Sequence, residues 1–63
     1  MTPAFLQVID SNNDLLILRI NQIDYVEARE DNKSTIMFLD DSEMEVNTSV
    51  FEISKVLLTC VDN

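Results

Sequence analysis

Apolar residues occur along the chain in short runs, and clusters of Asn, Asp and Ser separate these runs. Runs of about four to eight residues rich in Val, Ile, Thr, Phe and Tyr, bounded by such turn-forming residues, are typical of β-strands. The pattern predicts strands over residues 4–9, 15–20, 23–28, 34–39 and 43–47. Because the connections are short, we expect consecutive strands to pair antiparallel as a meander.

The hydrophobic period changes after Ser49. Glu52 follows Ser49 at the spacing of a capping box, in which the serine oxygen accepts the backbone N–H of the glutamate and the carboxylate reaches back. Apolar residues then recur at intervals of three and four, on one helical face: Val50, Ile53, Val56, Leu57 and Cys60. We therefore expect a helix from the N-cap Ser49 to Thr59 or Cys60.

The predicted fold is thus a single small α+β domain over residues 1–63. It is an antiparallel β-meander of four to five strands followed by one C-terminal helix packed on the sheet. Strand side chains alternate between faces, so one face collects only apolar residues: Leu6, Val8, Leu16, Leu18, Ile20, Ile36, Phe38, Met44 and Val46. This face is the expected core.

The opposite face of the predicted sheet is mixed. It collects Phe5, Gln7, Ile9, Leu15, Ile17, Arg19, Thr35, Met37, Leu39, Glu45 and Asn47. A helix is about 10 Å across and strands lie about 4.8 Å apart, so one helix shields only about two or three strands of one face. Apolar groups on the reverse side then need a partner, a second copy, or a sheet that curls into a small barrel. The predicted interface comprises Ile17, Arg19, Tyr25, Met37 and Leu39.

Length and composition also favour association with a partner or a second copy. A chain of 63 residues makes one domain and buries little surface, so it is marginally stable alone. A single cysteine excludes an internal disulfide, which leaves packing or oligomerisation as the source of stability. The sequence contains no glycine, so turns that need positive φ must use Asn or Asp.

Twelve acidic residues against four basic ones give a net charge of -8. Such a chain repels phosphates and anionic lipids, so we expect no direct contact with nucleic acid or membrane. The lone Cys60 and the absence of a recognisable targeting segment around Met1 favour a cytoplasmic location, in the producing cell or in an infected host.

The sequence offers little for catalysis or for binding a cofactor. There is no histidine for proton transfer, no activating base beside Cys60, and no glycine for a phosphate-binding loop. Residues 10–14 match the opening of a calcium loop, but Leu15 and Asn21 occupy the positions that need glycine and glutamate. We interpret this segment as an Asx-rich turn, and expect no catalytic residue, metal site or cofactor.

The stretch from Leu16 to Leu57 resembles the small FlbD-type flagellar proteins. The matching parts are Ile23-Asp24-Tyr25-Val26-Glu27, Thr35-Ile36-Met37-Phe38-Leu39, Asp40-Asp41, Val46 and Ser49-Val50-Phe51-Glu52-Ile53. The same pattern is similar to the β-core of LytTR-type DNA-binding domains, which are longer and basic. The turn glycines of the FlbD-type pattern are missing here, and Met37 and Leu39 stand where such proteins have polar residues. The resemblance has no catalytic motif to transfer.

Three functions fit these observations. The first is a non-enzymatic, self-associating module that acts by binding another protein. The second is a phage-type inhibitor or nucleic-acid mimic that blocks a host factor through its acidic surface. The third is a small-ligand-binding oligomer in which Arg19 and Tyr25 supply the polar contacts.

Overall fold

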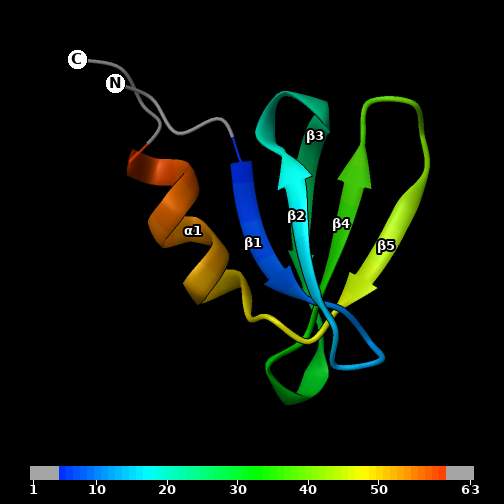
Figure 1. Cartoon of the computed structure of the whole chain (residues 1–63), viewed down its shortest axis with the longest axis vertical. Coiled ribbons are helices and arrows are strands. Elements are labelled where there is room, and N and C mark those ends of the chain that lie inside the picture. Colours follow the sequence, from blue (N-terminus) through cyan, green and yellow to red (C-terminus); the bar gives the residue numbers. More distant parts are fainter. Residues whose placement is uncertain (1–4, 60–63) are drawn as a thin grey trace.

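The computed structural model describes residues 5–59, which form five strands and one α-helix (Figure 1). The elements are β1 (Phe5–Ile9), β2 (Leu15–Arg19), a 3-10 turn (Ile20–Gln22), β3 (Ile23–Ala28), a 3-10 turn (Glu30–Asn32), β4 (Ser34–Phe38), β5 (Glu43–Val46) and α1 (Val50–Thr59). This order confirms the predicted α+β fold, an antiparallel meander followed by one helix that packs on it.

The meander is divided into two sheets, β1–β2 and β3–β4–β5. The β2 and β3 strands do not pair, because Ile20 belongs to the 3-10 turn that redirects the chain between them and not, as expected, to the second strand. One isolated bridge joins Asp10 to Val46, and beside it the N–H of Asn47 donates to the carbonyl of Ile9 at 2.7 Å. Over the described residues the strands therefore do not close into a barrel.

The hairpin turns follow one plan. In each, the last residue of the incoming strand or the residue directly after it donates its N–H to a carbonyl four residues later: Asp10 to Asp14 at 2.8 Å, Arg29 to Lys33 at 2.8 Å and Phe38 to Ser42 at 2.9 Å. Each loop reverses the chain through left-handed residues, which are Asn13, Asp31, Asn32 and Asp41, with φ between 60° and 71°. This confirms that Asn and Asp take the conformations for which many chains use glycine.

The core lies between the two sheets and α1. Its fully buried apolar residues are Leu6, Val8, Ile36, Val46 and Ile53, each at most 1% exposed. Every member of the predicted core face is buried or half-buried, which confirms the alternation on which that face was based. The core therefore draws on strands of both sheets and on the helix.

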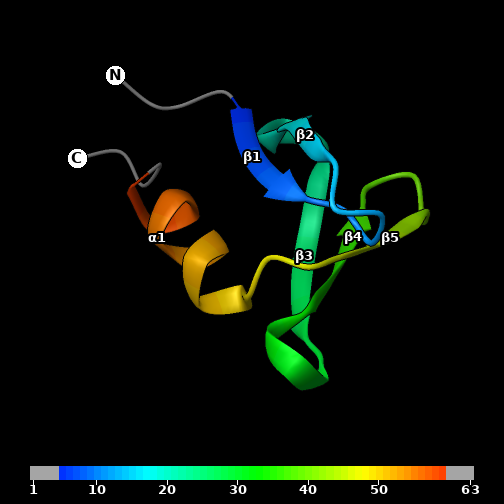
Figure 2. The ribbon, with the colours of Figure 1, turned by 60° about the horizontal axis from the view of Figure 1, so that its bottom comes forward.

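The helix begins as predicted. Ser49 Oγ accepts the backbone N–H of Glu52 at 3.2 Å, whereas the Glu52 carboxylate lies 3.3 Å from Lys55 Nζ on the next turn. The inward stripe is also confirmed, with Ile53 fully buried; Cys60 lies outside the described residues. α1 packs against β1 and β3, one strand from each sheet (Figures 1 and 2).

Thr35, on the mixed face, is buried and not exposed as the alternation predicts. Thr35 was expected on the uncovered side, yet it is only 4% exposed. Arg29 Nε donates to Thr35 Oγ1 at 2.8 Å, and the same guanidinium pairs with Glu27 at 3.2 Å. The methylene groups and the guanidinium of Arg29 thus cover Thr35 on the outer face of the sheet.

Candidate interaction surface

The five residues predicted to form an interface fall on two sheets. Ile17 and Arg19 are exposed on β2, and Ile17 is 64% exposed. Tyr25 and Met37 are direct cross-strand neighbours on β3 and β4, and Leu39, 62% exposed, follows β4. The structure therefore brings Tyr25 and Met37 together and places Ile17 and Arg19 on the other sheet.

The outer face of the β1–β2 sheet is mostly apolar, with Gln7 and Arg19 as its polar members. Phe5, Leu15 and Ile17 are 53%, 56% and 64% exposed, and neither strand contains an acidic residue. Register places Phe5 opposite Arg19, whose guanidinium carbon lies 5.9 Å from the centroid of the phenyl ring. Phe5 and Leu15 were not among the predicted interface residues, although their places on the mixed face could have indicated them.

Within residues 5–59, the sheet of β2 contains only β1 and β2, so β2 has one unpaired edge. Asp10 donates to Asp14 across the hairpin, and bonded pairs alternate with non-bonded pairs along an antiparallel ladder. The register then bonds Leu16 and Leu18 to β1. The backbone N–H groups of Leu15, Ile17 and Arg19 and the C=O groups of Leu15 and Ile17 consequently point towards the free edge, whereas the C=O of Arg19 is the N-cap acceptor of the 3-10 turn.

A groove of roughly 350 Å³ runs beside this edge. It is lined by Ile17, Leu18, Arg19, Gln22, Phe38, Asp40 and Ser42. Its far wall is the β4–β5 turn, which a 2.9 Å bond from the N–H of Leu39 to the carbonyl of Gln22 holds in place. Hydrogen bonds from the Ser42 hydroxyl, at 2.6 Å, and from the Ser42 N–H, at 3.0 Å, hold the pKa of Asp40 below its ordinary value.

The outer face of the β3–β5 sheet has the opposite character. Glu43 lies across from Met37, and Glu27 and Glu45 lie on either side of Thr35. Arg19 and Tyr25 are on different sheets, and Tyr25 does not line the groove beside Arg19. The two residues suggested as contacts for a small ligand therefore lie apart on different sheets of one molecule.

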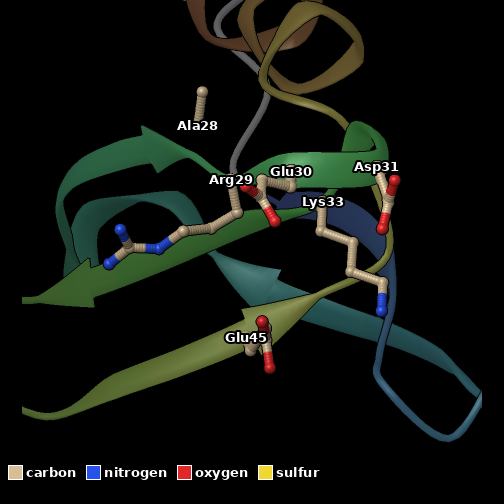
Figure 3. Close-up of a pocket in the computed structure, with 6 residues that line it drawn as sticks. All are labelled: Ala28, Arg29, Glu30, Asp31, Lys33 and Glu45. Atoms are coloured by element: carbon tan, nitrogen blue, oxygen red, sulfur yellow. The ribbon is translucent and has the colours of Figure 1, made fainter.

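A second depression, of roughly 620 Å³, lies at the β3–β4 hairpin. It is lined by Ala28, Arg29, Glu30, Asp31, Lys33 and Glu45 (Figure 3). The two cations extend in different directions, and Arg29 is occupied by Thr35 and Glu27. Its charges are of both signs and do not converge on one point.

The helix also exposes two apolar side chains that were not predicted as surface contacts. Phe51 and Leu58 are 69% and 68% exposed, and their spacing of seven residues puts them on one helical face. Lys55 lies between them, with Nζ 4.9 Å from the Phe51 ring centroid. That spacing was visible in the sequence.

The acidic turn after β1 is held by its own side-chain hydrogen bonds. Asp10 Oδ1 accepts the backbone N–H groups of Asn12 and Asp14, each at 2.9 Å, which confirms the Asx-type turn. Among residues 5–59, no group of three or more Asp, Glu, Cys or His side chains is placed to hold a metal ion. Within the same part of the chain, no helix is long and apolar enough to cross a bilayer.

The resemblance to FlbD-type proteins stays a prediction from the sequence pattern. No protein-family model, no curated protein and no solved structure matches the chain.

Proposed function

We propose that this chain is a non-enzymatic interaction module that self-associates and acts by binding another protein. Self-association would use the outer face of the β1–β2 sheet. The observation that carries this proposal is the exposure of Phe5, Leu15 and Ile17 on strands that contain no acidic residue. Contiguous exposed apolar surface on a small protein marks interaction sites more often than it marks free surface.

Charge supports the choice of this face. The chain carries -8, so two copies repel each other wherever their acidic residues meet. The acidic side chains of the strands all belong to β3 and β5, namely Asp24, Glu27, Glu43 and Glu45. The β1–β2 sheet is the broad surface on which two copies can approach with the least repulsion.

The non-enzymatic part of the proposal is supported by the chemistry of the surface. Catalytic groups need convergent polar atoms in a pocket that excludes water. The depression at the β3–β4 hairpin is open and has charges of both signs that do not converge, and Asp40 is the one acid among the residues that line the groove beside β2. Binding of a macromolecule is the better match to such surfaces.

Sedimentation equilibrium tests the proposal. The wild-type chain should show a reversible monomer–dimer equilibrium, and Ile17→Asp should shift it to monomer while the circular dichroism spectrum stays native. Phe51→Asp is the matched control, because it adds the same charge at a residue of similar exposure on α1. A wild-type chain that remains monomeric at millimolar concentration contradicts the proposal, and dissociation by Phe51→Asp alone would assign the contact to the helix.

A second candidate function follows from the acidic sheet. The outer face of β3–β5 and its turns fit a basic protein partner, as an inhibitor that imitates nucleic acid charge would require. Glu43→Lys and Glu45→Lys should then weaken capture by a strongly basic partner without weakening self-association. Equal capture by the wild type and by these variants would contradict this second function.

A further inference from the structure

We infer that two copies of the chain pair antiparallel through the free edges of their β2 strands, with Ile17 opposite Ile17. This rests on the proposed self-association and specifies its geometry. Joined in this way, the two β1–β2 sheets become one four-stranded sheet, in the order β1–β2–β2–β1. The exposed Leu15 and Ile17 then acquire cross-strand neighbours on the second copy.

The strand edges of the molecule are not equally protected. Natural sheets guard exposed edges with charged residues, bulges or a covering segment. The outer edge of β5 carries Glu43 and Glu45, and the outer edge of β3 has a register shift at Asp24 and α1 beside it. The edge of β1 that faces away from β2 is occupied at Ile9, whose N–H donates to Thr48 Oγ1 at 2.8 Å.

Among the described strands, β2 alone lacks these devices. Its residues Leu15–Arg19 hold one charged side chain, Arg19, and no acid. Its pairing with β1 is regular over all five residues. An edge of this kind, regular in its pairing and largely apolar, is the type that accepts another strand.

The backbone geometry fixes a register. The backbone N–H groups of Leu15, Ile17 and Arg19 point to the free edge. A twofold axis at Ile17 sets Ile17 opposite Ile17 and each Leu15 opposite an Arg19 of the second copy. All three are then hydrogen-bonded pairs. The central pair exchanges two hydrogen bonds, and each outer pair contributes the bond from the N–H of Arg19 to the C=O of Leu15, because the C=O of Arg19 is the N-cap acceptor of the 3-10 turn; this gives about four bonds across the new ladder. The strand is five residues long with Ile17 at its centre, so this register uses the whole edge.

Charge identifies a second copy as the occupant. A basic peptide would meet Arg19 on this edge and find Asp40 as the one acid among the residues that line the adjoining groove, whereas the acidic side chains of the strands belong to β3 and β5. In the twofold arrangement the two Arg19 residues sit at opposite ends of the ladder, about 14 Å apart for an offset of four residues at 3.4 Å each. Asp14, the residue just before β2, comes to the same end as Arg19 of the second copy. The edge is thus complementary to itself.

Disulfide trapping in the full chain tests the register, in a Cys60→Ser background that removes the native thiol. Residues in a bonded antiparallel pair have Cα atoms about 5.5 Å apart, which suits a disulfide. Ile17→Cys should therefore form a linked dimer under mild oxidation. Leu15→Cys alone should form none, because its own copies lie about 14 Å apart.

A mixture of Leu15→Cys and Arg19→Cys chains keeps Ile17 and supplies the second measurement. It should yield the mixed disulfide and neither homodimer. If the unoxidised chains associate in sedimentation but Leu15→Cys crosslinks to itself, or Ile17→Cys does not, the register is wrong and self-association by another geometry stands. If the wild type does not associate at all, both this inference and the proposed function fail.

Discussion

The backbone N–H of Ile9 donates a 2.8 Å hydrogen bond to the side-chain hydroxyl of Thr48, in the segment between β5 and α1. The carbonyl of the same threonine accepts the hydroxyl of Ser34, which is fully buried on β4, at 2.7 Å. Thr48 thus connects a strand of each sheet. It also occupies the edge of β1 that would otherwise be open, which leaves β2 as the unprotected edge of that sheet.

Replacing Thr48 by Val should destabilise the fold by about 1–3 kcal/mol, because the part-buried N–H of Ile9 loses its acceptor while the shape of the side chain is kept. Thr48→Ser is the control, since it retains the hydroxyl and should lose much less. Urea unfolding followed by circular dichroism measures both. Equal midpoints for Thr48→Val and the wild type would show that the bond contributes nothing.

The helix cap gives a second prediction for stability. Ser49→Ala removes the acceptor for the Glu52 N–H and should cost about 1 kcal/mol. Ser49→Asp keeps an acceptor at the N-cap and adds a charge that the helix dipole favours, so it should preserve stability. Thermal unfolding of the three chains compares them; an alanine variant as stable as the aspartate variant would contradict the capping role.

The groove beside β2 yields a prediction on protonation. Ser42 stabilises the ionised form of Asp40, so the pKa of Asp40 in the folded chain lies below 3.8, its ordinary value. Its contribution to stability is therefore present above the unfolded pKa and is lost as pH falls through the lower folded pKa. An NMR titration of the carboxyl carbon should show this, and Ser42→Ala should raise the pKa towards 3.8 while Ser42→Thr keeps it low. An unchanged pKa in Ser42→Ala would mean that the hydroxyl has no effect on it.

Salt separates the two candidate functions. Raising ionic strength from about 0.1 M to 1 M shortens the Debye length from about 10 Å to about 3 Å. Self-association of a chain with a charge of -8 should become tighter, because repulsion between the copies is screened. Binding of a basic partner should become weaker over the same range. Self-association that weakens with KCl in sedimentation experiments would place charged contacts at its centre and contradict an apolar interface.

Most of the fold was predictable from the sequence because its hydrophobic periods are local. Alternation placed Leu6, Val8 and Ile36 in the core, and the capping box located the start of α1 at Ser49. The division into two sheets was not predictable in this way. It depends on Ile20, an apolar residue that continues the pattern of β2 but turns out of the strand into a 3-10 turn.

The interface was harder to predict from the sequence for the same reason, which is the break between β2 and β3. A single continuous sheet would place Ile17 and Met37 on one face, whereas the break between β2 and β3 assigns them to different sheets. Thr35 is also buried, although alternation places it on the exposed face, because the side chain of Arg29 covers it. Both outcomes depend on contacts between segments that no local pattern records.

Amide hydrogen exchange by NMR at two protein concentrations tests the use of the β2 edge most directly. The N–H of Ile17 and that of Glu43 both point to outer strand edges, so in an isolated molecule both should exchange quickly. The account predicts that the exchange of Ile17 slows as concentration rises, while Glu43 remains fast. If Ile17 exchanges as fast as Glu43 at every concentration at which the chain associates, the β2 edge is not where two copies meet.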